Sequence, residues 1–567
     1  MLTVGTDESS LALAADSASG RARAAALDAM ARVATRPTSA VAYKSAGAVV
    51  IIGPEDAAIA AAEALRPRLE CTVVSPPASA KQASRAAKSG GLELAREKVL
   101  QVSGHLGQFA VVVTAPAPLG GINLLQKLAS SRTHFDLVLD LTDPPFLRQE
   151  LRPFGYYAPG SDAQALRAAL AEMPEMVGEF EKPRFFRYDP AICAHSRSGQ
   201  TGCTRCLDAC PAGAIVSLVD EVAVDPYLCQ GAGLCATVCP TGAMTYVYPT
   251  LTDQLRRLAA LLKTYRAEGG EHPVLLLHDA ETGRSRLGAL GARLPENVIP
   301  FELAELGSLG MEAWLAALAY GAERILWLPT SSTPPSVIGA VSEQVHYCGK
   351  ILEGMAYSPD RLKMLSGDDS AVVALLASPP EEIQWPPAAF GGVDEKRTVL
   401  RLAIEHLYTH APAPQEMVAL PQGAPFGEVL VNRDTCTLCM ACVSVCPASA
   451  LSDGADLPQL NFVEANCVQC GLCEGACPEQ AIQRAPRYLY DAEQRRHARV
   501  LNEEAPFLCI SCGRPFATRQ MMDRMTEKLR GHWMFESDDA LRRLKMCGDC
   551  RVRDMFASGG RQPGGHA

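Results

Sequence analysis

A chain of 567 residues is long enough for three or four domains. With 48% hydrophobic and 20% charged residues it has the composition of soluble globular domains, and its formal net charge of −10 argues against nucleic acid as a partner. We expect no transmembrane segment, because no apolar run reaches the necessary length. Of the 21 cysteines, most stand in metal-binding patterns rather than disulfide patterns. With no signal peptide evident, this favours a reducing compartment and a cytoplasmic protein.

The N-terminal third predicts a leader followed by a small α/β domain. Residues 1–40 are rich in Ala, Ser and Arg and have no strong pattern, so we expect a weakly structured leader that is partly helical or mobile. Residues 41–180 alternate between apolar runs and Ala-rich segments. Residues 47–53 predict a buried strand, 56–66 a helix and 71–75 a second strand.

A cysteine-rich block at 185–248 predicts a ferredoxin-like module for two [4Fe-4S] clusters. Bacterial ferredoxins use the spacing C-x2-C-x2-C-x3-C-P, in which three thiolates bind one cluster and the fourth binds the other. Gln200 stands where the first thiolate of the first run belongs. We expect Cys193 to replace it through a longer loop. Cluster A is therefore assigned to Cys193, Cys203, Cys206 and Cys239.

The second site of this module, cluster B, lacks a ligand. The residue midway between Cys229 and Cys235 is Ala232, which cannot ligate iron, so that only Cys210, Cys229 and Cys235 remain. A three-iron cluster, a four-iron cluster with a water or borrowed ligand, and no cluster all stay open. Near cluster A, His195 either hydrogen-bonds the cluster and shifts its potential or braces its own loop.

Residues 250–390 predict a second α/β domain, followed by a Pro-rich linker at 391–430. The expected strands are 273–278, 298–302 and 324–328, and the expected helices are 251–266, 311–320 and 335–356. Alternation of this kind gives a parallel sheet with right-handed crossovers. We find no phosphate-binding loop and no acid–base pair in it.

Residues 431–487 carry the complete ferredoxin pattern twice. Cluster C is assigned to Cys436, Cys439, Cys442 and Cys477. Cluster D is assigned to Cys467, Cys470, Cys473 and Cys446. Four Cys-Pro sites in the chain share a Pro-x-x-Ala tail, so the two modules are copies of one unit.

The C-terminal region, 500–567, predicts a four-cysteine knuckle module. Two C-x2-C pairs form one tetrahedral site made of Cys509, Cys512, Cys547 and Cys550. Zinc is the first choice of metal and iron the alternative. We expect the aromatic stretch 532–535 between the pairs to pack in a core.

Three further features carry less information. Arg495, Arg496 and Arg499 form a basic patch, which we expect to be a solvated face or a dock for an acidic partner. Cys71 and Cys348 stand outside every metal pattern, and we expect both to be buried small apolar residues.

Several segments carry a resemblance to a known family. They are Cys193-Ala-His-Ser-Arg-Ser-Gly-Gln, Phe154-Gly-Tyr-Tyr-Ala-Pro-Gly, Gly178-Glu-Phe-Glu-Lys-Pro and the C-terminal module. Together they resemble large proteobacterial 4Fe-4S binding proteins, whose genes tend to lie beside those of molybdenum formate dehydrogenases. The resemblance implies a redox role near formate oxidation. Ala232 departs from the family pattern, which has a cysteine there.

The middle region is similar to the delta subunit of methyl-viologen-reducing hydrogenases. The similarity lies in Asn297-Val-Ile-Pro, Gly321-Ala-Glu-Arg-Ile-Leu and Gln344-Val-His-Tyr. Related subunits carry a two-iron cluster in this region. Because only Cys348 is present here, we expect that cluster to be absent.

The sequence thus predicts a multidomain α/β and α+β protein with two ferredoxin-like modules, two small α/β domains and a knuckle module. The leading hypothesis is an iron–sulfur protein that carries single electrons between redox partners, one of them a formate dehydrogenase system. The second is an accessory or maturation factor for a molybdenum or iron–sulfur dehydrogenase. The third is an enzyme that uses an open iron of cluster B. We find no catalytic residues.

Overall fold

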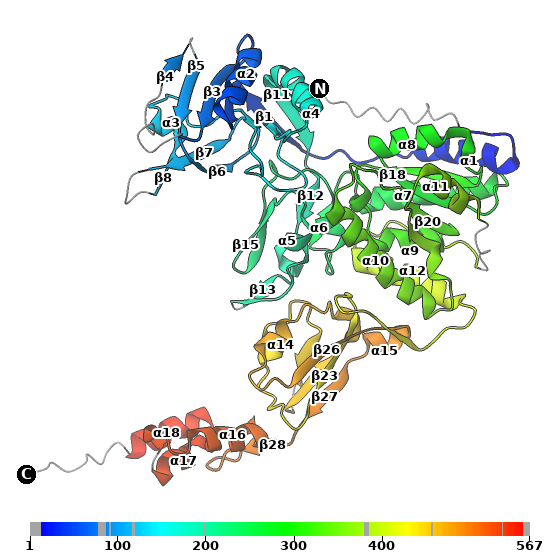
Figure 1. Ribbon diagram of the computed structural model, residues 1–567. Helices are drawn as coiled ribbons and strands as arrows, with labels where there is room; N and C mark the ends of the chain where they lie inside the picture. The colour runs from blue at the N-terminus through cyan, green and yellow to red at the C-terminus, as the bar shows by residue number, and fades with distance from the viewer. Residues whose placement is uncertain are drawn as a thin grey trace, which may run out of the picture.

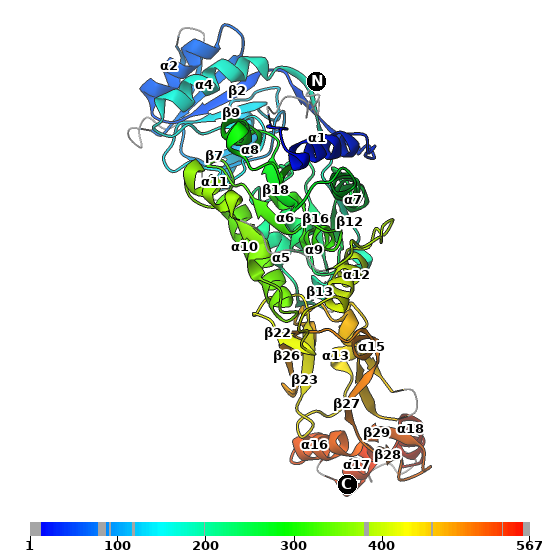
Figure 2. The same ribbon diagram turned by 90° about the vertical axis from the view of Figure 1, so that its right-hand side faces the viewer.

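The computed structural model describes residues 13–77, 87–89, 92–115, 120–197, 199–378, 385–454, 457–535 and 537–558. The molecule is elongated (Figures 1 and 2). Two α/β domains lie at one end with the first cysteine-rich module beside the middle domain, the second cysteine-rich module follows along the long axis, and the C-terminal module lies at the other end. Within the described ranges, no helix is both long enough and apolar enough to cross a membrane.

The N-terminal α/β domain is built on a six-stranded sheet in the order β10-β9-β2-β3-β5-β4. Its central strand β2 (Ala48–Ile52) is buried at every residue, as expected of a parallel strand covered on both faces. The other strands are β3 (Glu70–Ser75), β4 (Ala87–Ser89), β5 (Leu92–Arg96), β9 (Leu137–Asp140) and β10 (Tyr156–Tyr157). The helices are α2 (Glu55–Leu65), α3 (Leu124–Lys127) and α4 (Ala163–Glu172).

Two smaller strand sets complete this domain. An antiparallel sheet contains β6 (Val99–Ser103), β7 (Ala110–Thr114) and β8 (Gly121–Asn123). The strand β1 (Ala40–Ser45) pairs antiparallel with β11 (Gly178–Pro183). Because β11 leads directly into the first cysteine-rich module, this pair joins the domain to that module.

The described part of the predicted leader contains a helix, which agrees with the partly helical alternative, but the close packing of this helix was not predicted. α1 (Ala18–Ala31) lies along α7 (Leu251–Ala267) of the middle domain. The buried face of α1 consists of Ala22, Ala26 and Met30. Arg23 is also buried and donates to the carbonyls of Pro295 and Val298, each at 3.0 Å. Small alanines allow close helix packing but give little apolar periodicity, which explains why the packing was not predicted.

The middle domain has a parallel sheet in the order β19-β18-β20-β21, which confirms the predicted parallel layer. Its strands are β18 (Val274–Asp279), β19 (Val298–Leu303), β20 (Arg324–Trp327) and β21 (Leu362–Met364). The surrounding helices are α8 (Thr282–Leu290), α9 (Met311–Ala319), α10 (Pro335–Glu353) and α11 (Asp369–Ala377). Trp314 and Trp327 meet edge to face in the core, with ring centroids 4.7 Å apart and no exposed surface.

The predicted linker at 391–430 was wrong, because it contains a core helix. α12 (Lys396–Thr409) packs on α9 and buries Val399, Ala403 and Leu407. This helix was not predicted, because Pro-rich stretches flank it on either side. Its first turn lies against both cysteine-rich modules, so α12 positions them.

The two cysteine-rich modules are made of short strands and single-turn helices. The first contains α5 (Arg205–Ala209), α6 (Leu234–Thr237) and the strands β12 (Phe186–Tyr188), β13 (Ser196–Arg197), β14 (Gln200–Thr201), β15 (Ile215–Leu218), β16 (Glu221–Val224) and β17 (Met244–Tyr246). The second contains α13 (Ala441–Ser444), α14 (Leu472–Ala476), α15 (Ala492–Arg496) and the strands β22 (Met417–Ala419), β23 (Gly427–Val431), β24 (Leu451–Asp453), β25 (Gln459–Phe462), β26 (Ile482–Leu489) and β27 (Arg499–Glu503).

The C-terminal module has one small hairpin and three helices. They are β28 (Pro506–Leu508), β29 (Pro515–Thr518), α16 (Arg519–Leu529), α17 (Asp538–Leu544) and α18 (Gly548–Ser558). The expectation that residues 532–535 pack in a core was wrong, since Trp533 is 75% exposed and Met534 is 57% exposed. This module is too small to bury them, because its apolar cluster consists mainly of Met546 and the cysteines.

The packing of α1 predicts that Met30→Ala destabilises the middle domain. Removing a side chain that is 1% exposed costs about 2–5 kcal/mol, because it loses burial and leaves a cavity. Urea unfolding followed by tryptophan fluorescence measures the change. The matched control is Arg32→Ala in the neighbouring turn, whose side chain is 77% exposed and should change stability by less than about 0.5 kcal/mol. Equal effects of the two changes would contradict the packing of α1.

Candidate metal centres

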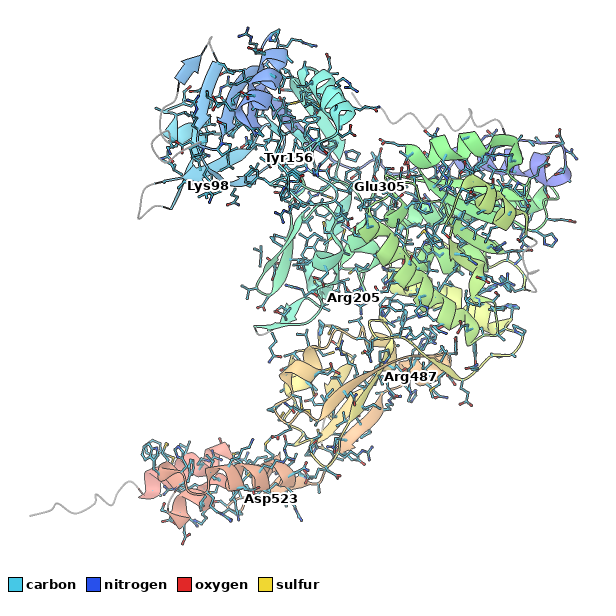
Figure 3. All side chains as sticks on the ribbon, viewed as in Figure 1. Lys98, Tyr156, Arg205, Glu305, Arg487 and Asp523 are labelled. Carbon is cyan, nitrogen blue, oxygen red and sulfur yellow. The ribbon has the colours of Figure 1, made fainter. Side chains whose placement is uncertain are left out.

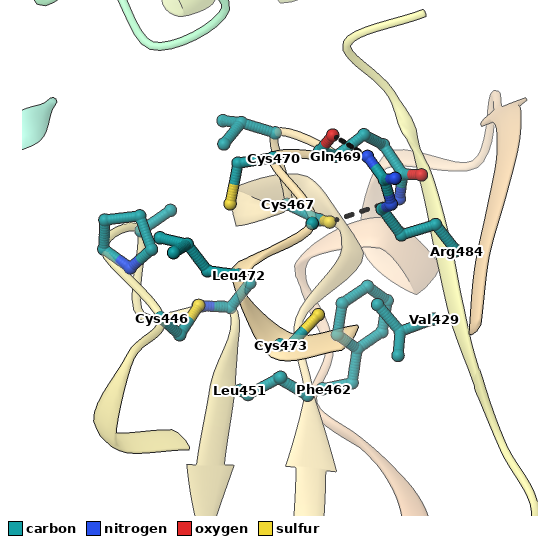
Figure 4. Close-up of a pocket in the computed structure, with 15 residues that line it drawn as sticks. Val429, Cys446, Leu451, Phe462, Cys467, Gln469, Cys470, Leu472, Cys473 and Arg484 are labelled. Carbon is teal, nitrogen blue, oxygen red and sulfur yellow. Dashed lines mark hydrogen bonds between the residues drawn. The ribbon is translucent and has the colours of Figure 1, made fainter. Parts of the chain in front are cut away.

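Four cysteines of the second module line one cavity of about 380 Å³ (Figure 4). They are Cys446, Cys467, Cys470 and Cys473, the set assigned to cluster D. Cys446 belongs to the first cysteine run and the other three to the second, so the two runs cross at this cavity. The rest of the wall is largely apolar, with Leu451 and Phe462 among its residues. An apolar lining that excludes water from four thiols suits a [4Fe-4S] cluster.

A second cavity, of about 320 Å³, contains the converse set. It is lined by Cys436, Cys439, Cys442 and Cys477, the residues assigned to cluster C. Burial, followed by the neighbouring cysteines, raises the pKa of the Cys442 thiol to about 12. A buried thiol of this kind becomes a thiolate when a metal neutralises its charge.

The thiols of the first module are close enough to influence one another's pKa. Burial raises the pKa of Cys206 to about 12, and the next contributions come from Cys239, Cys203 and Cys193. These four are the residues assigned to cluster A. Burial also raises the pKa of Cys235, with Cys229 and then Cys210 as the nearest contributors. Those three are the cluster B set.

The shared tail after each Cys-Pro has a structural reason. The N–H of Ala214 donates to the sulfur of Cys210 at 3.4 Å. The equivalent bonds in the second module run from Ala450 to Cys446 at 3.2 Å and from Ala481 to Cys477 at 3.3 Å. At Cys239 the donor is one residue later, Met244, at 3.4 Å. N–H donors to ligand sulfurs stabilise negative charge and so raise the reduction potential of a cluster.

Ala232 sits in a closed apolar environment. It is 8% exposed and belongs to the core of the middle domain. The turn at 306–308 packs directly on its loop, since a Cβ on Gly307 would lie 2.6 Å from the Ala232 carbonyl oxygen. Thr237 donates to the Gly307 carbonyl at 2.7 Å and fixes that turn. A methyl group at position 232 therefore contributes to the contact between module and domain.

Two polar side chains support the loops of the first module. His195 is 2% exposed and uses both ring nitrogens, at 2.9 Å from the Cys203 carbonyl and 2.7 Å from the Ser217 hydroxyl. These contacts favour the loop-bracing interpretation. Lys182 donates to the carbonyl of Cys229 at 2.7 Å, and burial lowers its pKa to about 8. Sequence reasoning missed Lys182, although it stands in the Gly178-Glu-Phe-Glu-Lys-Pro segment.

The two modules touch at Gly202 and Leu472. A Cβ on Gly202 would lie 2.6 Å from the Leu472 Cγ, so the chain needs glycine for this approach. The hairpin strand β14 and helix α14 meet here. Burial raises the pKa of Cys203, next to Gly202, to about 11, and the thiol of Cys470 is close enough to contribute to this increase. The cluster A and cluster D residues are therefore neighbours across the interface.

The C-terminal module brings Cys509, Cys512, Cys547 and Cys550 together, with their sulfurs all within 4.8 Å of one another. Burial raises the pKa of Cys509, but the backbone N–H groups of Cys547 and Cys512 outweigh it and lower that pKa to about 6. The N–H of Cys547 lies 3.2 Å from the Cys509 sulfur. Four thiols this close suit one tetrahedral ion, zinc or iron, better than a cubane.

The basic patch is the solvated face that was expected only at Arg496, whose side chain is 57% exposed. Arg495 is 5% exposed and donates to the carbonyls of Leu489 and Tyr490. Arg499 pairs with Glu428 and Glu464 at 2.7 and 3.1 Å. These glutamates were not predicted as partners because they lie far from the arginines in the sequence. Cys71 and Cys348 are buried, at 8% and 0% exposure, which confirms the expectation for both.

Comparison with known proteins agrees with the paired arrangement of the cysteines. Family models described as 4Fe-4S dicluster domain match residues 176–243 and residues 435–482. The chain therefore contains two 4Fe-4S dicluster domains.

Among curated proteins, similarity extends to proteins named "Putative formate dehydrogenase" from Staphylococcus aureus strains USA300 and NCTC 8325 / PS 47. The identity is 28% over 141 residues, covering 21% of this chain. The match spans only 14% of the length of each relative.

The crossed cavities predict that Cys446→Ala disrupts the cluster bound by the second cysteine run and spares the other. Iron content should fall by about four per chain, since one [4Fe-4S] cluster loses a ligand. Electron paramagnetic resonance after reduction identifies the cluster that is lost. The comparison variant is Cys477→Ala, which should affect the cluster of Cys436, Cys439 and Cys442. If each variant instead damaged the cluster of its own run, the crossed arrangement would be wrong.

Proposed function

We propose that this chain is an electron-transfer protein that passes single electrons between redox partners through a row of iron–sulfur clusters. The order along the row is C, D, A and then B where B forms. The ligands are the cysteine sets assigned from the sequence, and the four-cysteine site holds a structural zinc. Two dicluster domains imply electron transfer, because such clusters carry one electron at a time.

The contact between the modules is the observation that carries this proposal. Each dicluster domain alone would bring two clusters together, but a conduit needs the two pairs to be in electronic contact. The Cys203 thiol lies close enough to Cys470 for the two to interact electrostatically, and the neighbouring Gly202 lies against Leu472 of the second module. Electron tunnelling falls steeply with distance, so a glycine at this position keeps the transfer step between the domains short.

The protein residues set the environment of the clusters. The clusters supply the redox chemistry when bound. The apolar walls exclude water, and the N–H groups of the Cys-Pro tails stabilise the reduced form. Lys182 adds a positive charge beside Cys229 at the cluster B end.

One redox partner in this proposal is a formate dehydrogenase system. The support is the partial match to proteins that carry that name, together with the resemblance of the sequence motifs. The 21 free cysteines suit a reducing compartment such as the cytoplasm.

Metal and sulfide analysis of anaerobically purified protein, followed by a redox titration monitored by electron paramagnetic resonance, tests the proposal. We expect roughly twelve to sixteen irons, one zinc and reversible one-electron reduction. A three-iron signal in the oxidised sample would identify an altered cluster B. Far fewer irons, or clusters that do not take up electrons reversibly, would contradict the proposal.

The interface predicts that Gly202→Ala slows electron transfer from clusters C and D to clusters A and B by several-fold or more. The added Cβ meets the Leu472 side chain at 2.6 Å and the Ala194 carbonyl at 2.9 Å, so the loops must separate. Rapid freeze-quench spectroscopy after reduction of the chain measures the rate. Gly391→Ala is the control, since a Cβ there meets nothing within 4 Å. An unchanged rate with unchanged iron content would show that electrons do not cross here.

The C-terminal module favours a second candidate, an accessory or maturation factor for a dehydrogenase. Its exposed aromatic side chains, Trp533 at 75% and Phe556 at 82%, suit a partner surface more than a redox site. Binding assays with the mature and the cofactor-free dehydrogenase separate the two functions. A conduit binds the mature enzyme, whereas a maturation factor binds only the cofactor-free form.

A further inference from the structure

An arginine-rich cavity of about 290 Å³ lies beside the second module, below α12. The charged and polar residues that line it are Arg397, Arg401, Arg487, Arg495, Glu464 and Tyr488. Figure 3 places Arg487 in the second module where it faces the middle domain. The cavity is nearly as large as those formed by the cluster C and cluster D cysteines. Four guanidinium groups around one space are unusual, because like charges repel unless anions separate them.

Two of these arginines have their charge balanced by carboxylates. Arg487 forms ion pairs with Glu464 and Glu428, each at 2.7 Å. Arg495 pairs with Glu405 at 3.0 Å. The glutamates are shared, because Arg499 also contacts Glu428 and Glu464, and Arg496 also contacts Glu405.

The other two arginines have no carboxylate partner. In the described parts of the chain, no Asp or Glu lies within ion-pair distance of Arg397 or Arg401, and both donate to carbonyl oxygens instead. The nearby Glu395 is engaged elsewhere, since its carboxylate accepts from the N–H groups that begin α12. Counting Arg496 and Arg499, six guanidinium groups face four glutamates, because Arg496 also contacts Glu493, which leaves two positive charges in excess.

Two buried donors of residues that line the cavity are also unused. The Nε of Arg397 and the hydroxyl of Tyr488 have no hydrogen-bond partner among the described residues. Arg397 is 9% exposed and Tyr488 is 3% exposed. Buried polar groups are normally hydrogen-bonded, so two unused donors beside uncompensated charge indicate a missing acceptor that carries negative charge.

We propose that this cavity binds a small oxyanion of the carboxylate or phosphate class. The planar guanidinium fork of Arg401 and the Nε of Arg397 match the oxygens of such an anion, and the Tyr488 hydroxyl adds a neutral donor. The site does not depend on the electron-transfer proposal. It lies close to two cluster sites, because Arg397 also donates to the carbonyls of Cys467 and Pro240 at 3.1 and 3.2 Å.

Calorimetric titration of the anaerobic holoprotein with inorganic phosphate and with formate tests this site, with chloride at matched ionic strength as the reference. We expect saturable binding of at least one oxyanion and none of chloride. The phosphate and formate arms identify which class the cavity takes. Arg401→Gln should weaken the affinity ten-fold or more, and Tyr488→Phe several-fold. Arg401→Lys keeps the charge without the fork and should fall between the wild type and Arg401→Gln.

The control is Arg32→Gln, which removes an equal charge from an arginine whose side chain is 77% exposed and which directly follows α1. Its affinity should equal that of the wild type. Iron content and circular dichroism of every variant confirm that the fold and clusters are intact. The proposal is overturned if neither oxyanion binds saturably, which is the result expected if the clusters themselves balance Arg397 and Arg401. It is also overturned if a folded Arg401→Gln protein binds as tightly as the wild type.

Discussion

The relative position of the two dicluster domains depends on the first turn of α12. Lys396 donates to the carbonyls of Ala236 and Thr237 in the first module, at 2.7 and 2.8 Å. Arg397, the next residue, donates to Pro240 in the first module and to Cys467 in the second. A guanidinium with five donors in one plane can hold carbonyls from two modules at once, which an ammonium or an amide cannot do over the same span. The interface between the modules is therefore fixed through backbone atoms.

This arrangement gives the two copies of one sequence unit different environments. The second copy keeps all eight cysteines, and each set of four lines its own cavity. The first copy is wedged between two α/β domains, and its loop at Ala232 packs against the turn at 306–308. One of the two positions that depart from the repeat is thus in direct contact with a neighbouring domain.

The sequence alone was sufficient where spacing encodes the chemistry directly. The C-x2-C-x2-C-x3-C-P runs predicted which cysteines share a cavity in the second module, and apolar alternation predicted three strands of the parallel middle sheet. The other features were not predicted, because the residues that interact lie far apart in the sequence. Nothing near Arg495 indicates that Glu405 neutralises it, and the Pro-rich flanks of α12 concealed a buried helix. The exposure of Trp533 was not predicted, because a cluster of aromatic residues indicates a core unless the module is known to be too small to form one.

The attachment of α1 to the middle domain has a consequence for how the protein is made. Arg23 bonds to Pro295, 272 positions further along the chain. At a ribosomal rate of about 5–20 residues per second, the partner of α1 emerges on the order of tens of seconds later. By then all strands of the N-terminal sheet have been synthesised. Residues 40–183 can therefore fold while α1 still lacks its partner. The nascent chain therefore folds as a loop whose first helix docks late, after α7 and β19 have left the ribosome.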